Sequence, residues 1–226
     1  MKFSRVLFFA SLALAAPTAL VEKDEPALLL DERQNDPVSA VVTALNSVTN
    51  TINTSGGAIQ SAINGITGNV DAQVQVLIRA NLDAILKALQ DATTTILTST
   101  LDSAGNITAA ASGLTQAQIN NLAAAVQGAI AAVNQLRIIA TLTATDLTPA
   151  VFDLVQGQIT AIQNTIQPFI TPVAAFANAV SKFNARIGIT VLGLTNATST
   201  LVNTVRNLLN GLGLGGLGGL LGGILG

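Results

Sequence analysis

Hydrophobic residues recur every three or four positions through most of this chain, which is the spacing of one face of an α-helix. In the clearest series, steps of three and four alternate over five heptads, as in an amphipathic helix seam. Thr148 followed by Pro149 predicts its start, because proline favours the first helical position. Pro168 and Pro172 each remove a backbone hydrogen bond, so we expect two helices or one bent helix. The series comprises Phe152, Val155, Ile159, Ile162, Ile166, Phe169, Val173, Phe176, Val180, Phe183 and Ile187.

Shorter stripes of the same period predict the remaining helices. Asp36-Pro37 opens the first, and Gly56-Gly57 is expected to break it. Thr115 and Gln118 have the spacing of a capping box, with Leu114 placed to pack on Ile119. The predicted helices cover residues 38–52, 59–66, 74–96, 119–146 and 198–209.

These stripes predict an all-α fold, an antiparallel bundle of five or six amphipathic helices over residues 34–210. Residues 106–113 read as a small-residue loop. Residues 187–194 give one short candidate strand, which we discount. Large aliphatic residues are absent from several facing positions, so the sequence allows an internal cavity.

The N-terminus has the pattern of a secretory signal over residues 1–15. Lys2 and Arg5 precede an apolar run that is too short to span a membrane. Ala13-Leu14-Ala15 then supplies the small residues of a cleavage site. The sequence therefore predicts a secreted, extracellular or cell-wall protein without a transmembrane span.

Two further segments differ from the helical body in composition. Residues 16–33 are rich in charge and read either as a pro-segment cut after Arg33 or as a retained solvated tail. Residues 211–226 contain only Gly, Leu and Ile, and so many glycines predict disorder in water. This tail is open to three interpretations: a surface-adsorbing end, an inert low-complexity end, or a removed lipid-anchor signal, which the missing polar spacer disfavours.

The composition leaves little material for catalysis. Beyond Gln34 the chain has no His, Cys, Trp, Tyr, Met or Glu, from which most enzymes build acids, bases, nucleophiles and metal sites. We therefore expect no catalytic residues, no metal and no cofactor.

The net charge of −2 argues against nucleic acid as a partner. Only 10% of residues are charged, and the mean hydropathy is +0.57, which predicts exposed apolar surface or a covering of lipid or glycan.

The candidate binding residues lie on the phenylalanine-containing seam. An apolar ligand would be lined by Ile166, Phe169, Val173, Phe176, Val180 and Phe183, although an ordinary bundle core is the better explanation for each phenylalanine taken singly. Lys182 and Arg186 are candidates for contact with a fatty-acid carboxylate or an anionic lipid head, or else simply complement a helix C-terminus.

Asn53, Asn106 and Asn196 begin glycosylation sequons that we expect at helix boundaries. Arg79, Asp83, Lys87 and Asp91 predict a solvated ladder of ion pairs.

Several of these features together resemble the fungal hydrophobic surface-binding protein A and cell-wall mannoprotein family. They are the signal ending LALAAP, the charged segment ending DERQ, and the Ala/Thr/Leu-rich helices over roughly residues 36–185. The runs GLTQAQINNLAAAVQGAIAAVNQL and LTPAVFDLVQGQITAIQ are similar to the helical core of that family. The resemblance implies a secreted helical protein that adsorbs to hydrophobic surfaces or holds fatty acids between its helices.

Two functions follow as expectations. The first is a secreted, non-enzymatic protein that binds hydrophobic surfaces or lipids, such as fatty acids, through apolar helix faces. The second is a structural or self-assembling component of a cell wall or coat, with cell-wall components as partners.

Overall fold

The computed structural model describes residues 36–65, 72–101, 105–147 and 149–211, and these residues form helices and turns without any strand. The predicted signal peptide, the charged segment 16–33 and the tail beyond Gly211 lie outside the described residues. The elements are α2 (Pro37–Asn64), α3 (Ala72–Thr100), α4 (Thr108–Ala111), α5 (Gln116–Asp146), α6 (Pro149–Phe183), η1 (Ala185–Ile187) and α7 (Ile189–Gly211). The predicted all-α bundle is confirmed.

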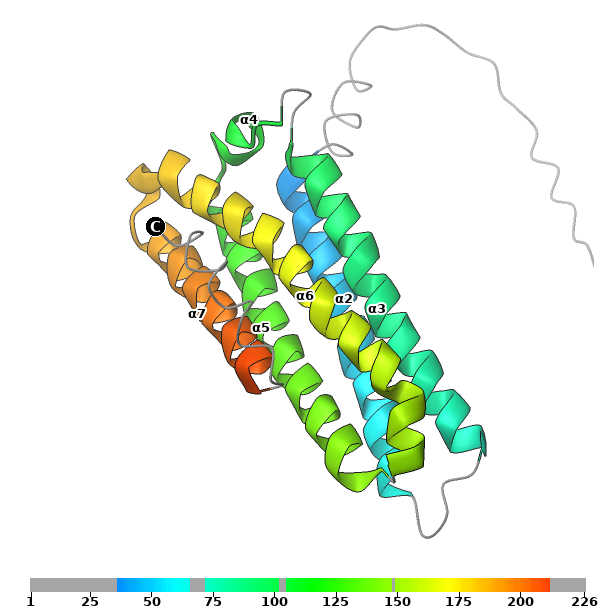
Figure 1. Cartoon of the computed structure of the whole chain (residues 1–226). Helices are drawn as coiled ribbons and strands as arrows, with labels where there is room; N and C mark the ends of the chain where they lie inside the picture. The colour runs from blue at the N-terminus through cyan, green and yellow to red at the C-terminus, as the bar shows by residue number, and fades with distance from the viewer. Residues whose placement is uncertain (1–35, 66–71, 102–104, 148, 212–226) are drawn as a thin grey trace, which may run out of the picture.

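Five long helices form a closed ring around one core (Figure 1). Helix α2 packs between α3 and α5, α6 packs on α3, and α7 closes the ring between α5 and α6. Consecutive long helices alternate in direction, with α3 followed by α5 across the short α4, whereas three neighbouring pairs run the same way: α2 and α5, α3 and α6, and α5 and α7 (Figure 1). The short α4 and the α6–α7 turn lie at the end of the bundle where α2, α5 and α7 begin.

Helix α2 starts where the sequence predicts but is not broken by its two glycines. The Asp36 carboxylate accepts a hydrogen bond from the Val38 N–H at 3.0 Å and caps the helix, and Pro37 is its first residue. The helix then continues through Gly56 and Gly57 to Asn64, so the expected break is wrong. The physical reason is packing: Gly56 is buried against α5, and a Cβ there would lie only 2.8 Å from Ile139 Cδ1.

Helix α6 likewise runs without interruption through Pro168 and Pro172. Each proline costs about 3 kcal/mol inside a helix. The buried stripe of this helix offsets that cost, because full burial of one large apolar side chain stabilises a fold by about 1.5–3 kcal/mol. The stripe buries eight residues of the predicted seam: Val155, Ile159, Ile162, Ile166, Phe169, Val173, Phe176 and Val180.

The start of α5 confirms the predicted capping box. The Thr115 hydroxyl accepts a hydrogen bond from the Gln118 N–H, while the Gln118 side-chain oxygen accepts one from the Thr115 N–H. The Gln118 amide also donates to the Asp36 carboxylate at 3.1 Å, which joins the N-terminal ends of α2 and α5. The predicted loop 106–113 contains the single-turn α4, a small correction.

Helix α7 begins at Ile189, well before the predicted residue 198, and it includes most of the discounted strand candidate 187–194. The start is set by Gly188, whose φ of 59° lies in the left-handed region that favours glycine. Gly193 inside the helix weakened the sequence signal over this stretch. Helix α7 therefore begins shortly after α6, with only the short η1 between them.

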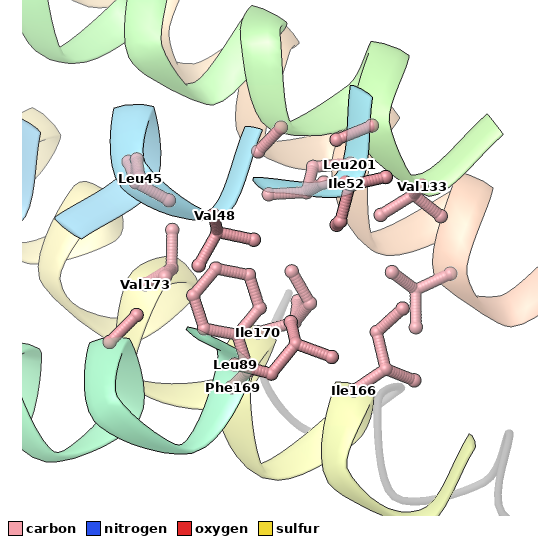
Figure 2. Close-up of a cluster of buried hydrophobic side chains, with 14 of the residues drawn as sticks. Leu45, Val48, Ile52, Leu89, Val133, Ile166, Phe169, Ile170, Val173 and Leu201 are labelled. Atoms are coloured by element: carbon pink, nitrogen blue, oxygen red, sulfur yellow. The ribbon is translucent and has the colours of Figure 1, made fainter. Parts of the chain in front are cut away.

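All five long helices contribute to the core shown in Figure 2. Phe169 of α6 lies among aliphatic side chains such as Leu45 and Val48 of α2 and Leu89 of α3, with Leu201 of α7 nearby. The few buried polar side chains include Thr100, Thr143 and Thr198, whose hydroxyls donate to the carbonyl four residues earlier. Packing of aliphatic and phenylalanine side chains therefore holds this bundle together.

Candidate apolar binding surface

The predicted apolar lining lies almost entirely inside the bundle. Ile166, Phe169, Val173, Phe176 and Val180 are each 1% exposed or less, whereas Phe183 at the end of α6 is 51% exposed. Figure 2 shows Ile166, Phe169 and Val173 pointing into the shared core rather than into an open groove. Of the six predicted lining residues, only Phe183 is therefore accessible to an external partner.

The apolar cavity between the described helices offers little volume for a ligand. One apolar cavity of about 20 Å³ lies where α7 ends, between α3, α5, α6 and α7. That volume holds roughly one water molecule. Its lining consists of Leu82, Leu136, Ile139, Ala140, Ile159, Ile162, Gln163, Ile166 and Leu208.

Exposed apolar side chains gather instead at the turn between α6 and α7. Phe183 is joined there by Ile189, 88% exposed, and Leu192, 58% exposed. We call these three residues the apolar tip. Its last two members were missed from the sequence, because they lie N-terminal to the predicted helix 198–209. Ile189 and Leu192 could have been found as large apolar residues that lie outside the buried stripe of the same helix. That stripe comprises Leu201, Val202, Val205 and Leu208.

The apolar tip is held in place by Asn184, which sequence reasoning also missed. This buried residue follows Phe183 directly. Its amide nitrogen donates to the carbonyl oxygens of Ala111 at 2.7 Å and Val180 at 2.9 Å, and its oxygen accepts from the Leu114 N–H at 3.1 Å. A second link joins the Thr195 hydroxyl to that of Ser181 at 3.1 Å. The turn is thereby anchored to α4 and to the start of α5.

Two cations lie beside the apolar tip in the sequence, with no acidic residue near them. Lys182 and Arg186 are both exposed and flank Phe183. Asp153 is the last acidic residue of the chain, and residues 154–226 carry Lys182, Arg186 and Arg206. Lys182 and Arg186 are thus exposed sequence neighbours of Phe183 at the end of α6, whereas the rest of the predicted lining is buried.

The three sequons occupy different environments, and all three asparagines are exposed. Asn106 lies in the connection before α4, as the prediction of boundary positions requires. Asn53 and Asn196 instead lie within α2 and α7, so the boundary prediction is wrong for them, because both helices are longer than expected. Asn196 is four residues after Leu192 and therefore shares its helix face.

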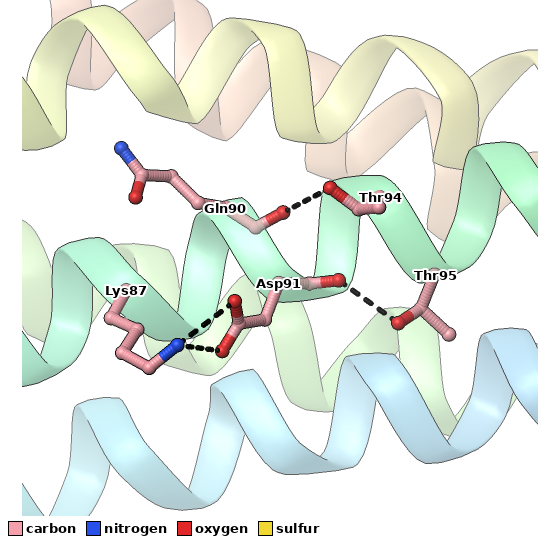
Figure 3. A network of polar contacts seen from close by, with 5 residues as sticks. All are labelled: Lys87, Gln90, Asp91, Thr94 and Thr95. Carbon is pink, nitrogen blue, oxygen red and sulfur yellow. Dashed lines mark hydrogen bonds and ion pairs between the residues drawn. The ribbon is translucent and has the colours of Figure 1, made fainter.

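The predicted ladder of charges on α3 forms one ion pair among the described residues. Lys87 Nζ lies 2.8 Å from the Asp91 carboxylate (Figure 3). Both side chains are largely exposed, so the contribution to stability is about 0.2–1 kcal/mol. Figure 3 also shows the hydroxyls of Thr94 and Thr95 bonded to backbone carbonyls one turn earlier. These side chains lie on a solvated face of α3.

Two further properties bear on function. Within the described ranges, no group of three His, Cys, Asp or Glu side chains is arranged to hold a metal ion. One stretch of α5, Gln116–Thr143, is long and apolar enough to cross a membrane by length and composition. In this fold it is a core helix, because α2 and α7 pack on it and it buries a continuous stripe from Ile119 to Ile139.

The chain matches no protein-family model, no curated protein and no solved structure.

Proposed function

We propose that this chain is a secreted, non-enzymatic protein that binds hydrophobic surfaces or lipids through its apolar tip. The observation that carries the proposal is the 88% exposure of Ile189 beside Leu192 and Phe183. A folded monomer gains nothing by holding three large apolar side chains in water at one turn. Large apolar side chains exposed together near one turn are typical of an interaction surface.

Free energy favours this mode over enclosure of a fatty acid. Full burial of one side chain of this size contributes about 1.5–3 kcal/mol, so removing the exposed parts of the apolar tip from water contributes on the order of 3 kcal/mol. A fatty acid inside the bundle would have to open a cavity of only about 20 Å³ and separate well-packed helices. The geometry thus supports adsorption at the outside of the fold.

Adsorption to beads tests the proposal. We expect saturable binding of the full chain to octadecyl-coated beads and much less to hydroxyl-coated beads. A variant with Ile189→Ser and Leu192→Ser should bind the octadecyl beads on the order of tenfold more weakly.

A matched control uses exposed side chains elsewhere. Arg137 and Ile138 are adjacent exposed residues on α5, so R137Q/I138S removes a cation and an apolar group away from the tip. Equal binding to both bead types, or equal loss in the control and the tip variant, would contradict the proposal.

A further inference from the structure

We infer that the α6–α7 turn docks on the surface of an anionic lipid bilayer, with the apolar tip entering the interface and Lys182 and Arg186 contacting lipid phosphates. This inference rests on the proposed function and specifies the partner of the same surface. It depends on the juxtaposition of exposed apolar groups with cations at one end of the bundle.

The pairing of residue types at this turn favours a bilayer over a purely apolar surface. An apolar surface such as wax or plastic interacts favourably only with the apolar groups. A bilayer interface binds apolar side chains below a layer of headgroup charge. Lys182 is adjacent to Phe183, and Arg186 is three residues before Ile189, within the same turn. Long cationic side chains beside interfacial apolar groups can extend their charges to the headgroups while their stems lie on hydrocarbon.

The sign of the local charge favours the same partner. Residues 105–136, which form α4 and the first part of α5 at this end of the bundle, contain no charged side chain. The described acidic group at the same end is Asp36, which already accepts hydrogen bonds from Val38, Ser39 and Gln118. Among the residues that the structure describes, the positive charge of the turn is therefore opposed weakly, although the whole chain has a net charge of −2.

The turn is also rigid. Asn184 fixes the turn to Ala111 and Leu114, so the apolar tip and its cations are presented together without ordering a loop on binding. Pre-organised side chains lose less conformational entropy on association.

The test is co-sedimentation of the full chain with vesicles of phosphatidylcholine alone and of phosphatidylcholine mixed with phosphatidylserine. We expect binding to the anionic vesicles that weakens as salt is raised. Each cation near an anionic surface contributes roughly a fivefold change in partitioning, so K182Q/R186Q should lower binding about 25-fold. I189S/L192S should lower it on the order of tenfold, and R137Q/I138S should leave it unchanged.

The bead assay run beside the vesicles separates this inference from the proposed function. Equal binding to both vesicle types, or unchanged binding by K182Q/R186Q, overturns the anionic bilayer as the partner. If the chain does not bind anionic vesicles but I189S/L192S still weakens its adsorption to octadecyl beads, the bilayer inference is overturned and the proposed function stands. If the chain binds neither the vesicles nor the octadecyl beads, the bilayer inference and the proposed function are both overturned. Vesicle binding by K182Q/R186Q and I189S/L192S is interpreted after circular dichroism shows their helix content unchanged.

Discussion

The side-chain nitrogen of Asn184 donates a hydrogen bond to the Ala111 carbonyl oxygen across 2.7 Å, although 73 residues separate them in sequence. The same amide group accepts from the Leu114 N–H. One buried side chain thus satisfies backbone groups at both ends of the connection between α4 and α5. This arrangement ties the turn that carries the apolar tip to the body of the bundle.

Asn184→Ala should destabilise the fold by about 2–4 kcal/mol. The substitution leaves the buried Ala111 carbonyl and the Leu114 N–H without this partner, and each unsatisfied buried group costs about 1–3 kcal/mol. Urea unfolding followed by circular dichroism measures the change. Asn207→Ala, an exposed site on α7, is the control and should shift stability by no more than about 0.5 kcal/mol. Equal effects at both sites would remove Asn184 from its anchoring role.

The adjacent glycines of α2 should respond oppositely to enlargement. A Cβ at Gly57 meets nothing within 4 Å, so Gly57→Ala should stabilise the helix by about 0.5–1 kcal/mol through propensity alone. At Gly56 a Cβ meets Ile139 Cδ1 at 2.8 Å and Gln135 Cγ at 3.2 Å, so Gly56→Leu should overpack the contact with α5 and cost about 1–3 kcal/mol. Thermal unfolding of the two variants checks the prediction. A destabilised Gly57→Ala would show that a neighbour crowds Gly57, and a neutral Gly56→Leu would show that α2 and α5 do not meet at Gly56.

These glycines illustrate which parts of the fold the sequence determines. The buried stripes, the cap at Asp36 and the capping box at Thr115 depend on neighbours in sequence, and all could be predicted. The unbroken paths of α2 and α6 depend on contacts with other helices, which periodicity does not report. Gly56 is read as a helix breaker until Ile139 is known to lie against it.

The candidate site was less predictable than the fold for the same reason. Phe169, Phe176 and Phe183 share one helical stripe, and nothing in their spacing distinguishes the buried pair from the exposed one. The distinction arises because α6 ends at Phe183, where the ring of helices no longer covers it. Ile189 and Leu192 were missed because their helix starts earlier than its apolar stripe indicates.

Substitutions along this stripe should separate core from binding surface. Phe176 is fully buried, so Phe176→Ala should destabilise the fold by about 3–5 kcal/mol. Phe183 is half exposed, so Phe183→Ala should cost less than about 1.5 kcal/mol and should instead weaken adsorption to octadecyl beads. Unfolding curves and bead binding, measured on the same preparations, check both halves. If Phe183→Ala unfolds as readily as Phe176→Ala and still binds the beads normally, Phe183 belongs to the core rather than to the tip.

Glycosylation at Asn196 should oppose adsorption. Asn196 follows Ile189 by seven residues and Leu192 by four, so all three share one face of α7, and all three are exposed. A glycan on that face would cover the apolar groups with hydrated sugar and hold the turn away from a surface. Mass spectrometry identifies protein that carries a glycan at Asn196. We expect this protein to bind octadecyl beads and anionic vesicles on the order of tenfold more weakly than the Asn196→Gln variant.

Asn53→Gln, on α2, tests whether any glycan has this effect and should leave binding unchanged. Thr198→Ala is an unsuitable way to remove the sequon, because the buried Thr198 hydroxyl bonds the Leu194 carbonyl at 2.8 Å. Undiminished binding by protein fully occupied at Asn196 would mean that the surface contacts another part of the molecule, because the sugar and the apolar tip cannot occupy the same interface.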